Sequence, residues 1–242
     1  MTAAVKSYSD FEREVDPHVE ARTEPLIIQF GFPGSGSTFV WQVLNSIFGN
    51  VKKTHKCPKY RADDRVVVTI RDFRDILCTY FKRANLPVTK QSIDFLVKEH
   101  AEANSSFNDL YQVSEAWAGK ENALWLRYED FVNDHDYLFG QLETFFRMKL
   151  TREQKEQASK NFSLEANKER SERVAVVCRK EGGEGWIDDK WQAYTIDGIN
   201  GLHVTGDGSV DKWRRIIPPE WHGYVSELLA EPLKRYGYRV EP

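Results

Sequence analysis

The sequence predicts an α/β fold: a single domain with a mostly parallel central sheet and helices on both of its faces. Short apolar, β-branched segments alternate along the chain with longer segments of helical period, which is typical of parallel sheets. The 242 residues are enough to bury one core without disulfide staples. The first predicted strand leads directly into a glycine-rich loop and a helix.

The predicted elements follow from the spacing of apolar residues. Residues 1–25 are polar and form a peripheral N-terminal segment, and residues 26–242 form the α/β domain. Apolar runs closed by turn residues predict strands at 26–30, 51–55, 65–70 and 123–128. Apolar positions at helical spacing predict helices at 37–49, 72–83, 88–117, 129–148, 151–170 and within 218–238.

The segment 180–210 has a different composition from the rest of the chain. It holds seven of the 15 glycines and shows no clear period. Long irregular segments of this kind in a globular domain are commonly functional loops. We therefore expect a lid or ligand loop there.

The composition excludes several classes of partner. The net charge of −3 gives no overall basic field, so we expect no nucleic-acid partner. No apolar run approaches the roughly 20 residues of a membrane span, and the first residues lack the apolar core of a signal peptide. The three cysteines, Cys57, Cys78 and Cys178, are widely spaced, which favours a cytoplasmic protein without disulfides or a metal site.

The loop "GFPGSGST" between the first strand and the first helix predicts an anion site. Its small residues aim backbone amides at one point, and the helix dipole adds to the attraction. Gly31, Gly36 and Thr38 have the spacing of a nucleotide-hydrolysing P-loop, but Ser37 stands where that motif has its lysine. The alternative is a tight strand–helix turn with no ligand.

Residues 33–39, "PGSGSTF", resemble the 5′-phosphosulfate loop of the sulfotransferase family, whose pattern is close to P-K-S-G-T-T-W. That family uses 3′-phosphoadenosine 5′-phosphosulfate (PAPS) as sulfuryl donor and releases 3′-phosphoadenosine 5′-phosphate (PAP). The resemblance implies that Ser35, Gly36, Ser37 and Thr38 hold the 5′-phosphate. It also places Phe39 where a family tryptophan stacks on adenine.

The segment "KKTH" resembles the family's K-T-H element and supplies the catalytic candidates. The resemblance implies that His55 is the general base and that Lys53 lies close to the transferring group. Histidine suits this chemistry because its pKa is close to neutral. The alternative is a structural or solvated histidine.

Two further segments follow in family order. In "VVVTIRDFRDILCTYF", the resemblance implies that Arg71 and Thr79 bind the 3′-phosphate. The alternative for this segment is a local network of arginine and aspartate pairs. In "LWLRYEDF", Tyr128 matches a family tyrosine near the adenine, although an ordinary strand–helix junction explains that stretch equally well.

The chain departs from the family pattern at two places. Gly34 stands where the family has lysine or arginine, and we expect Lys53 to supply the missing charge. The family's late R-K-G-x-x-G-x-W loop matches either residues 179–186 or residues 206–221. We favour the second segment, in which Arg214 or Arg215 would take the place of the basic pair.

The sequence therefore predicts a PAPS-dependent sulfotransferase that acts on a hydroxyl or amine of a small-molecule acceptor without a metal ion. One alternative is a P-loop kinase of a small metabolite, which would need the lysine that Ser37 replaces. Another is a non-catalytic nucleotide-binding protein, for which Gly34 is the argument.

Overall fold

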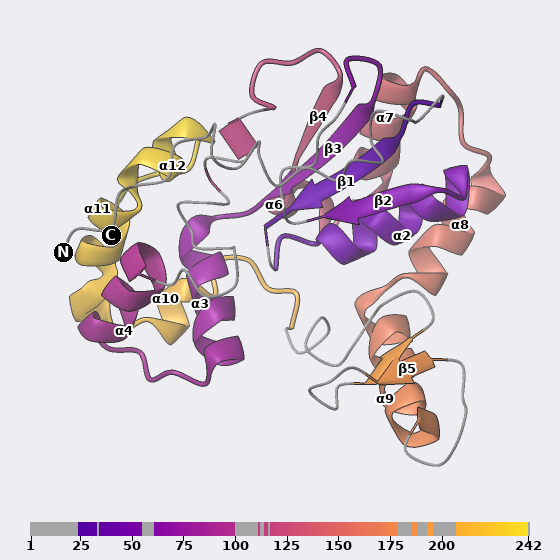
Figure 1. The fold of residues 1–242 in the computed structure, drawn as a ribbon. Helices are drawn as coiled ribbons and strands as arrows, with labels where there is room; N and C mark the ends of the chain where they lie inside the picture. The colour runs from indigo at the N-terminus through magenta and orange to yellow at the C-terminus, as the bar shows by residue number, and fades with distance from the viewer. Residues whose placement is uncertain are drawn as a thin grey trace. The chain divides into compact units, whose positions relative to one another are not determined.

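A four-stranded parallel sheet organises the chain in a computed structural model (Figure 1). The structure describes residues 24–32, 34–54, 61–99, 111, 114–115, 117–178, 185–187, 193–195 and 207–241. The strand order is β2-β1-β3-β4, and every neighbouring pair is parallel. The strands are β1 (Ile27–Gly31), β2 (Val51–Thr54), β3 (Arg65–Ile70) and β4 (Ala123–Arg127). The predicted α/β class and parallel sheet are confirmed.

Strand β3 shows why its residues form a central strand. Val66, Val68 and Ile70 alternate with Val67 and Thr69, and all five are buried. A strand buried on both faces is typical of a parallel sheet that is covered on each side. Residues of β3 pair with β1 on one edge and with β4 on the other.

The chain divides into two compact units that are interleaved in sequence. The first comprises Met1–Ser35, Asn50–Arg127 and Asp211–Pro242, and therefore contains the sheet. The second comprises Gly36–Gly49 and Tyr128–Val210. The expected boundary between a peripheral segment and the domain, at residue 25, stays a prediction because residues 1–23 lie outside the described ones.

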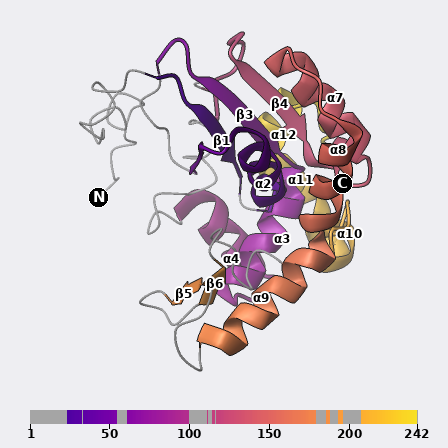
Figure 2. The same ribbon diagram turned by 90° about the vertical axis from the view of Figure 1, so that its right-hand side faces the viewer.

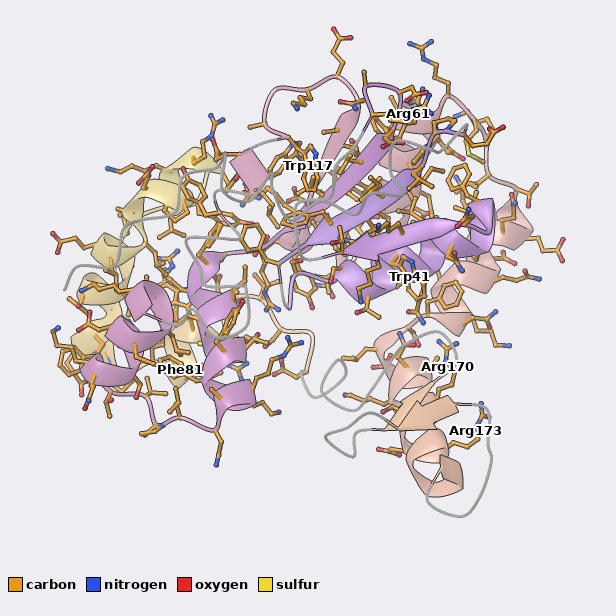
Figure 3. All side chains as sticks on the ribbon, viewed as in Figure 1. Trp41, Arg61, Phe81, Trp117, Arg170 and Arg173 are labelled. Carbon is orange, nitrogen blue, oxygen red and sulfur yellow. The ribbon has the colours of Figure 1, made fainter. Side chains whose placement is uncertain are left out.

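The first unit has one hydrophobic core between the sheet and its helices. The helices are α3 (Phe73–Ala84), α4 (Lys90–Asp94), η2 (Phe95–Glu99), α10 (Trp213–Ile216), η4 (Pro219–Trp221), α11 (His222–Leu228) and α12 (Ala230–Arg235). The core joins side chains of β1 and β3 to side chains of α3, α11 and α12. Trp117 lies edge-on to Phe30 of β1, with ring centroids 4.8 Å apart (Figure 3).

The second unit is helical with a small hairpin. Its helices are α2 (Ser37–Phe48), α6 (Tyr128–Phe131), α7 (His135–Phe146), α8 (Arg152–Asn161) and α9 (Leu164–Cys178). Helix α8 contacts α2, α7 and α9. Strands β5 (Gly185–Ile187) and β6 (Ala193–Thr195) pair antiparallel and contact α9 (Figure 2). The buried amides of Gln42 and Asn167 exchange two hydrogen bonds of 3.1 and 3.0 Å between α2 and α9.

Several predicted helices are broken in the structure. The single helix expected at 129–148 is wrong: α6 and α7 are separate, because the Asp134 carboxylate accepts the Tyr137 amide and starts a new helix. The helix expected at 151–170 is likewise interrupted between α8 and α9. The last predicted helix consists of η4, α11 and α12. Of the expected helix at 88–117, residues 100–110 lie outside the described residues, as does most of 180–210.

Candidate functional site

The loop after β1 contains two glycines whose positions admit no side chain. Gly34 and Gly36 have φ of +81° and +75°, in the left-handed region that favours glycine. A Cβ on Gly34 would lie 2.8 Å from Thr79 Oγ1. A Cβ on Gly36 would lie 2.8 Å from Phe131 Cζ. The family's cation at position 34 would therefore need a strained backbone and a displaced Thr79 side chain.

Ser35 stabilises the loop through hydrogen bonds to Phe32 and Thr69. Its side chain is fully buried, and its hydroxyl donates to Phe32 O at 2.6 Å and lies 2.8 Å from Thr69 Oγ1. Its amide also donates to Phe32 O, at 3.0 Å. Both donors of Ser35 are thus used within the protein, whereas the family resemblance implies that they hold a phosphate.

The helix that follows begins at Ser37, with Gly36 as its N-cap. Gly36 has no side chain with which to cap the first turn of α2. The first amides of a helix have no partner inside the helix, and they carry the positive end of its dipole. Gly36, Ser37 and Thr38, all predicted phosphate residues, lie at this helix start.

Arg71 follows β3 and contacts the loop. Its Nη1 donates to Gly34 O at 3.0 Å, and its Nε and Nη2 donate to Asp75 Oδ2 at 3.1 and 2.8 Å. Arg71 is 4% exposed and Asp75 is fully buried. Burial raises the pKa of Asp75, and the charge of Arg71 opposes that shift. The local arginine–aspartate pairs that were the alternative for this segment are present, as Arg71–Asp75 and Arg74–Asp72.

Thr79 lies one turn beyond Asp75 on α3 and brings in a residue that sequence reasoning missed. Its hydroxyl donates to Asp75 O at 3.3 Å and accepts from Lys212 Nζ at 3.0 Å. Trp213 follows Lys212 in the chain, and its backbone amide donates to Asp75 Oδ1 at 2.9 Å. The favoured segment 206–221 therefore reaches Thr79, through Lys212.

The predicted cations Arg214 and Arg215 are both exposed, and the Arg214 guanidinium lies 4.3 Å from the centroid of the Trp213 ring. The signal that could have identified Lys212 is its place directly before the tryptophan of that segment. In the sequence it lies 133 residues from Thr79, so their contact was not foreseeable from spacing.

Phe39 belongs to an aromatic cluster in the second unit. Its ring is stacked 6.4 Å from Phe131 and lies 4.8 Å from the ring of His135. Tyr128 lies edge-on to Phe131 at 5.7 Å, and its hydroxyl donates to Gly208 O at 2.9 Å. The two predicted adenine residues therefore share one cluster.

Of the two catalytic candidates, the structure describes Lys53 but not His55. Lys53 lies in β2 opposite Gln29, on the face of the sheet that also carries Thr69, and is half-buried. His55 lies outside the described residues, and the roles of both Lys53 and His55 stay predictions. Within the described ranges there is no cluster of three metal-ligating side chains, and no helix is both long and apolar enough to cross a membrane.

Comparisons with known proteins place this geometry in a known fold. The chain is similar to mouse sulfotransferase SULT7A1 crystallised with PAP, with a TM-score of 0.61 and 13% identity over 91% of this chain and 88% of that one. It is also similar to retinol dehydratase in complex with androsterone and the inactive cofactor PAP (TM-score 0.61, 15% identity, 93% and 85% covered).

A third similar structure is retinol dehydratase in complex with retinol and PAP (TM-score 0.60, 17% identity, 96% and 88% covered). No protein-family model matches the sequence, and no curated protein matches it. The chain therefore has the sulfotransferase fold, as an α/β protein with a phosphate-loop-like strand–loop–helix.

Proposed function

We propose that this protein is a sulfotransferase that moves a sulfuryl group from PAPS to a hydroxyl or amine of a small-molecule acceptor. The supporting observation is the contact between two predicted nucleotide motifs, in which Arg71 Nη1 donates to Gly34 O. The motifs follow β1 and β3, which are adjacent strands at the centre of the order β2-β1-β3-β4. Ligands of parallel α/β sheets bind beyond the carboxyl ends of such strands.

The residues present suit the phosphates of PAPS. Arg71, Thr79 and Lys212 are cationic and hydroxyl donors of the kind that bind a dianion, and Arg71 and Thr79 are our candidates for the 3′-phosphate. The first-turn amides of α2, at Gly36, Ser37 and Thr38, suit the 5′-phosphate. Ser35 keeps the loop in shape through its bonds to Phe32 and Thr69.

The adenine is assigned to Phe39 and Tyr128, whose rings offer an apolar face and belong to one cluster in the second unit. A purine is a flat aromatic ring, and stacking on such a cluster suits it. Tyr128 keeps its hydroxyl on Gly208 O in this assignment, so its contribution is its ring.

In the proposed reaction, PAPS supplies the sulfuryl group. His55 takes the proton of the acceptor hydroxyl or amine as the new bond to sulfur forms. The bond between sulfur and the bridging oxygen breaks, and its electron pair leaves with PAP. Amides and cations around the loop stabilise the negative charge that develops on the leaving phosphate. The retinol dehydratase structures contain small apolar molecules, which supports a small-molecule acceptor.

A second candidate function is a non-catalytic nucleotide-binding protein. The observation in its favour is Gly34, where neither the backbone conformation nor Thr79 admits a cationic side chain. This alternative predicts PAP binding without transfer to any acceptor. The kinase alternative is weaker, because Ser37 replaces the P-loop lysine.

A thermal-shift comparison of PAP, ATP and AMP tests the proposal. PAP at about 100 times its dissociation constant stabilises the fold by about 2.7 kcal/mol. We expect PAP to raise the melting temperature more than AMP or ATP, with or without magnesium. An equal or larger shift with ATP and magnesium would instead support the kinase, and no preference for PAP would refute the sulfotransferase assignment.

A further inference from the structure

Lys212 contacts Thr79, the side chain closest to position 34, although it comes from the last quarter of the chain. Its Nζ donates to Thr79 Oγ1 at 3.0 Å, and Thr79 Oγ1 is the atom that a side chain on Gly34 would meet first. We propose that Lys212 binds the 5′-phosphate end of the nucleotide and supplies the positive charge that position 34 cannot carry. This inference rests on the proposed function and assigns a residue to it.

Position 34 explains why the charge must come from another part of the chain. Gly34 has a φ of +81°, and the 2.8 Å approach of Thr79 Oγ1 leaves no space for even a Cβ. A lysine or arginine there would require both a strained backbone and a displaced Thr79. The Lys212 ammonium, 3.0 Å from the Thr79 hydroxyl, requires neither change.

The backbone around Lys212 is held by buried groups. The Trp213 amide donates to Asp75 Oδ1 at 2.9 Å, and the Trp213 ring is fully buried with the Arg74 guanidinium 4.1 Å from its centroid. Asp75 is the same carboxylate that pairs with Arg71. One buried aspartate therefore fixes the positions of both the Arg71 guanidinium and the start of α10, where Lys212 lies.

The side chain of Lys212 suits a phosphate ligand better than the other cations of its segment. It is half-buried, and its ammonium is a point charge on a flexible stem that can move from a hydroxyl to a nearby phosphate oxygen. Arg214 and Arg215 are exposed, and Arg214 stacks on Trp213. Lys212 is hydrogen-bonded to Thr79 Oγ1, so we assign to Lys212 the charge for which Lys53 was the first candidate.

Calorimetric titration with PAP and with 3′-AMP, which lacks the 5′-phosphate, tests the inference. We expect Lys212→Met to weaken PAP binding by about 10- to 100-fold, the usual range for a lost charge-assisted hydrogen bond. The affinity for 3′-AMP should change by less than about twofold, because that ligand has no group for Lys212 to bind. Lys212→Arg should keep most of the PAP affinity.

Lys234→Met is the matched control, since Lys234 is an exposed lysine of α12 in the same unit and its loss changes the net charge equally. We expect wild-type PAP affinity from it. The melting temperature of each variant without ligand shows whether it folds, and Lys212→Gln replaces the methionine variant if that one does not. Lys212→Met protein that binds PAP as wild type does would overturn the inference.

An equal loss of 3′-AMP affinity would overturn it too, by placing Lys212 at the 3′-phosphate. Wild-type protein that fails to bind PAP would refute the proposed function itself, so the two failures are distinguishable.

Discussion

Gly34 is the single residue that most affects the chemistry of the loop. The sequence identifies it as a departure from the family pattern, but it does not explain the departure. The explanation is steric: the residue has a positive φ, and Thr79 from α3 approaches it to within contact distance. Thr79 and Gly34 are 45 residues apart in the numbering, so only the folded chain reveals the conflict.

Gly34→Ala should be markedly more destabilising than Gly49→Ala. Gly49 is a matched control, because its φ is +75° and no described atom lies within 4 Å of a Cβ placed on it. Gly49→Ala carries the backbone strain alone, about 1 kcal/mol, whereas Gly34→Ala adds an overpacking cost of about 1–3 kcal/mol. Urea unfolding of the two variants measures the difference.

Gly34→Ala made in Thr79→Ala protein tests whether Thr79 causes the extra destabilisation. In Thr79→Ala protein the atom that a new Cβ would meet is absent, so the cost of Gly34→Ala should fall to that of Gly49→Ala. Equal costs for the two glycine variants in the wild-type background would show that Thr79 does not restrict position 34.

Ser35 shows a limit of motif matching at the residue level. The sequence correctly predicts that Ser35 lies in the loop. It does not predict which groups its hydroxyl and amide contact. Its hydroxyl is turned to Phe32 O and to Thr69 of β3, and that orientation depends on how the neighbouring strand packs. A motif that matches by residue type therefore leaves open which donors face a ligand.

At the scale of elements, strands were more predictable than helix ends. The strands are short β-branched runs bounded by turn residues, and all four lie within one residue of their expected bounds. The break between α6 and α7 was missed because apolar residues continue through it at helical spacing. The Asp134 cap decides the break, and a cap is a local hydrogen bond that periodicity does not detect.

His135, the first residue of α7, should make stability depend on pH. Burial lowers the pKa of His135 from 6.5, although Asp134 and Asp136 oppose the shift. Its charged form is also disfavoured at a helix N-terminus. Because the folded pKa lies below the unfolded one, the neutral ring stabilises the fold fully above pH 6.5, and that contribution is lost as the pH falls through the folded pKa.

The measurement compares wild type with His135→Gln, which retains a hydrogen-bonding group for Ser159. The free energy of unfolding should fall less in the variant than in wild type between about pH 7.5 and about pH 5, where histidine titrates. The same pH dependence in both proteins would show that His135 is not the group responsible.

At the scale of the whole molecule, strand order brings together motifs that are distant in sequence. Parallel strands β1 and β3 are neighbours, so the loop after one and Arg71 after the other meet at the same edge. The order of motifs along the chain was sufficient to predict that the loop after β1 and Arg71 belong to one site. The contribution of Lys212 was not predictable, since it depends on how the last 31 residues return to α3.

The most direct test of the account is transfer of labelled sulfuryl from PAPS to a panel of small hydroxyl and amine acceptors, with wild-type protein and His55→Ala. Removal of a general base typically lowers the rate by about 10²–10⁴-fold. We predict metal-independent transfer by the wild type, and a loss of that size in the variant with unchanged PAP affinity. Tight PAP binding by the wild type with no transfer to any acceptor, or equal transfer by both proteins, would contradict it.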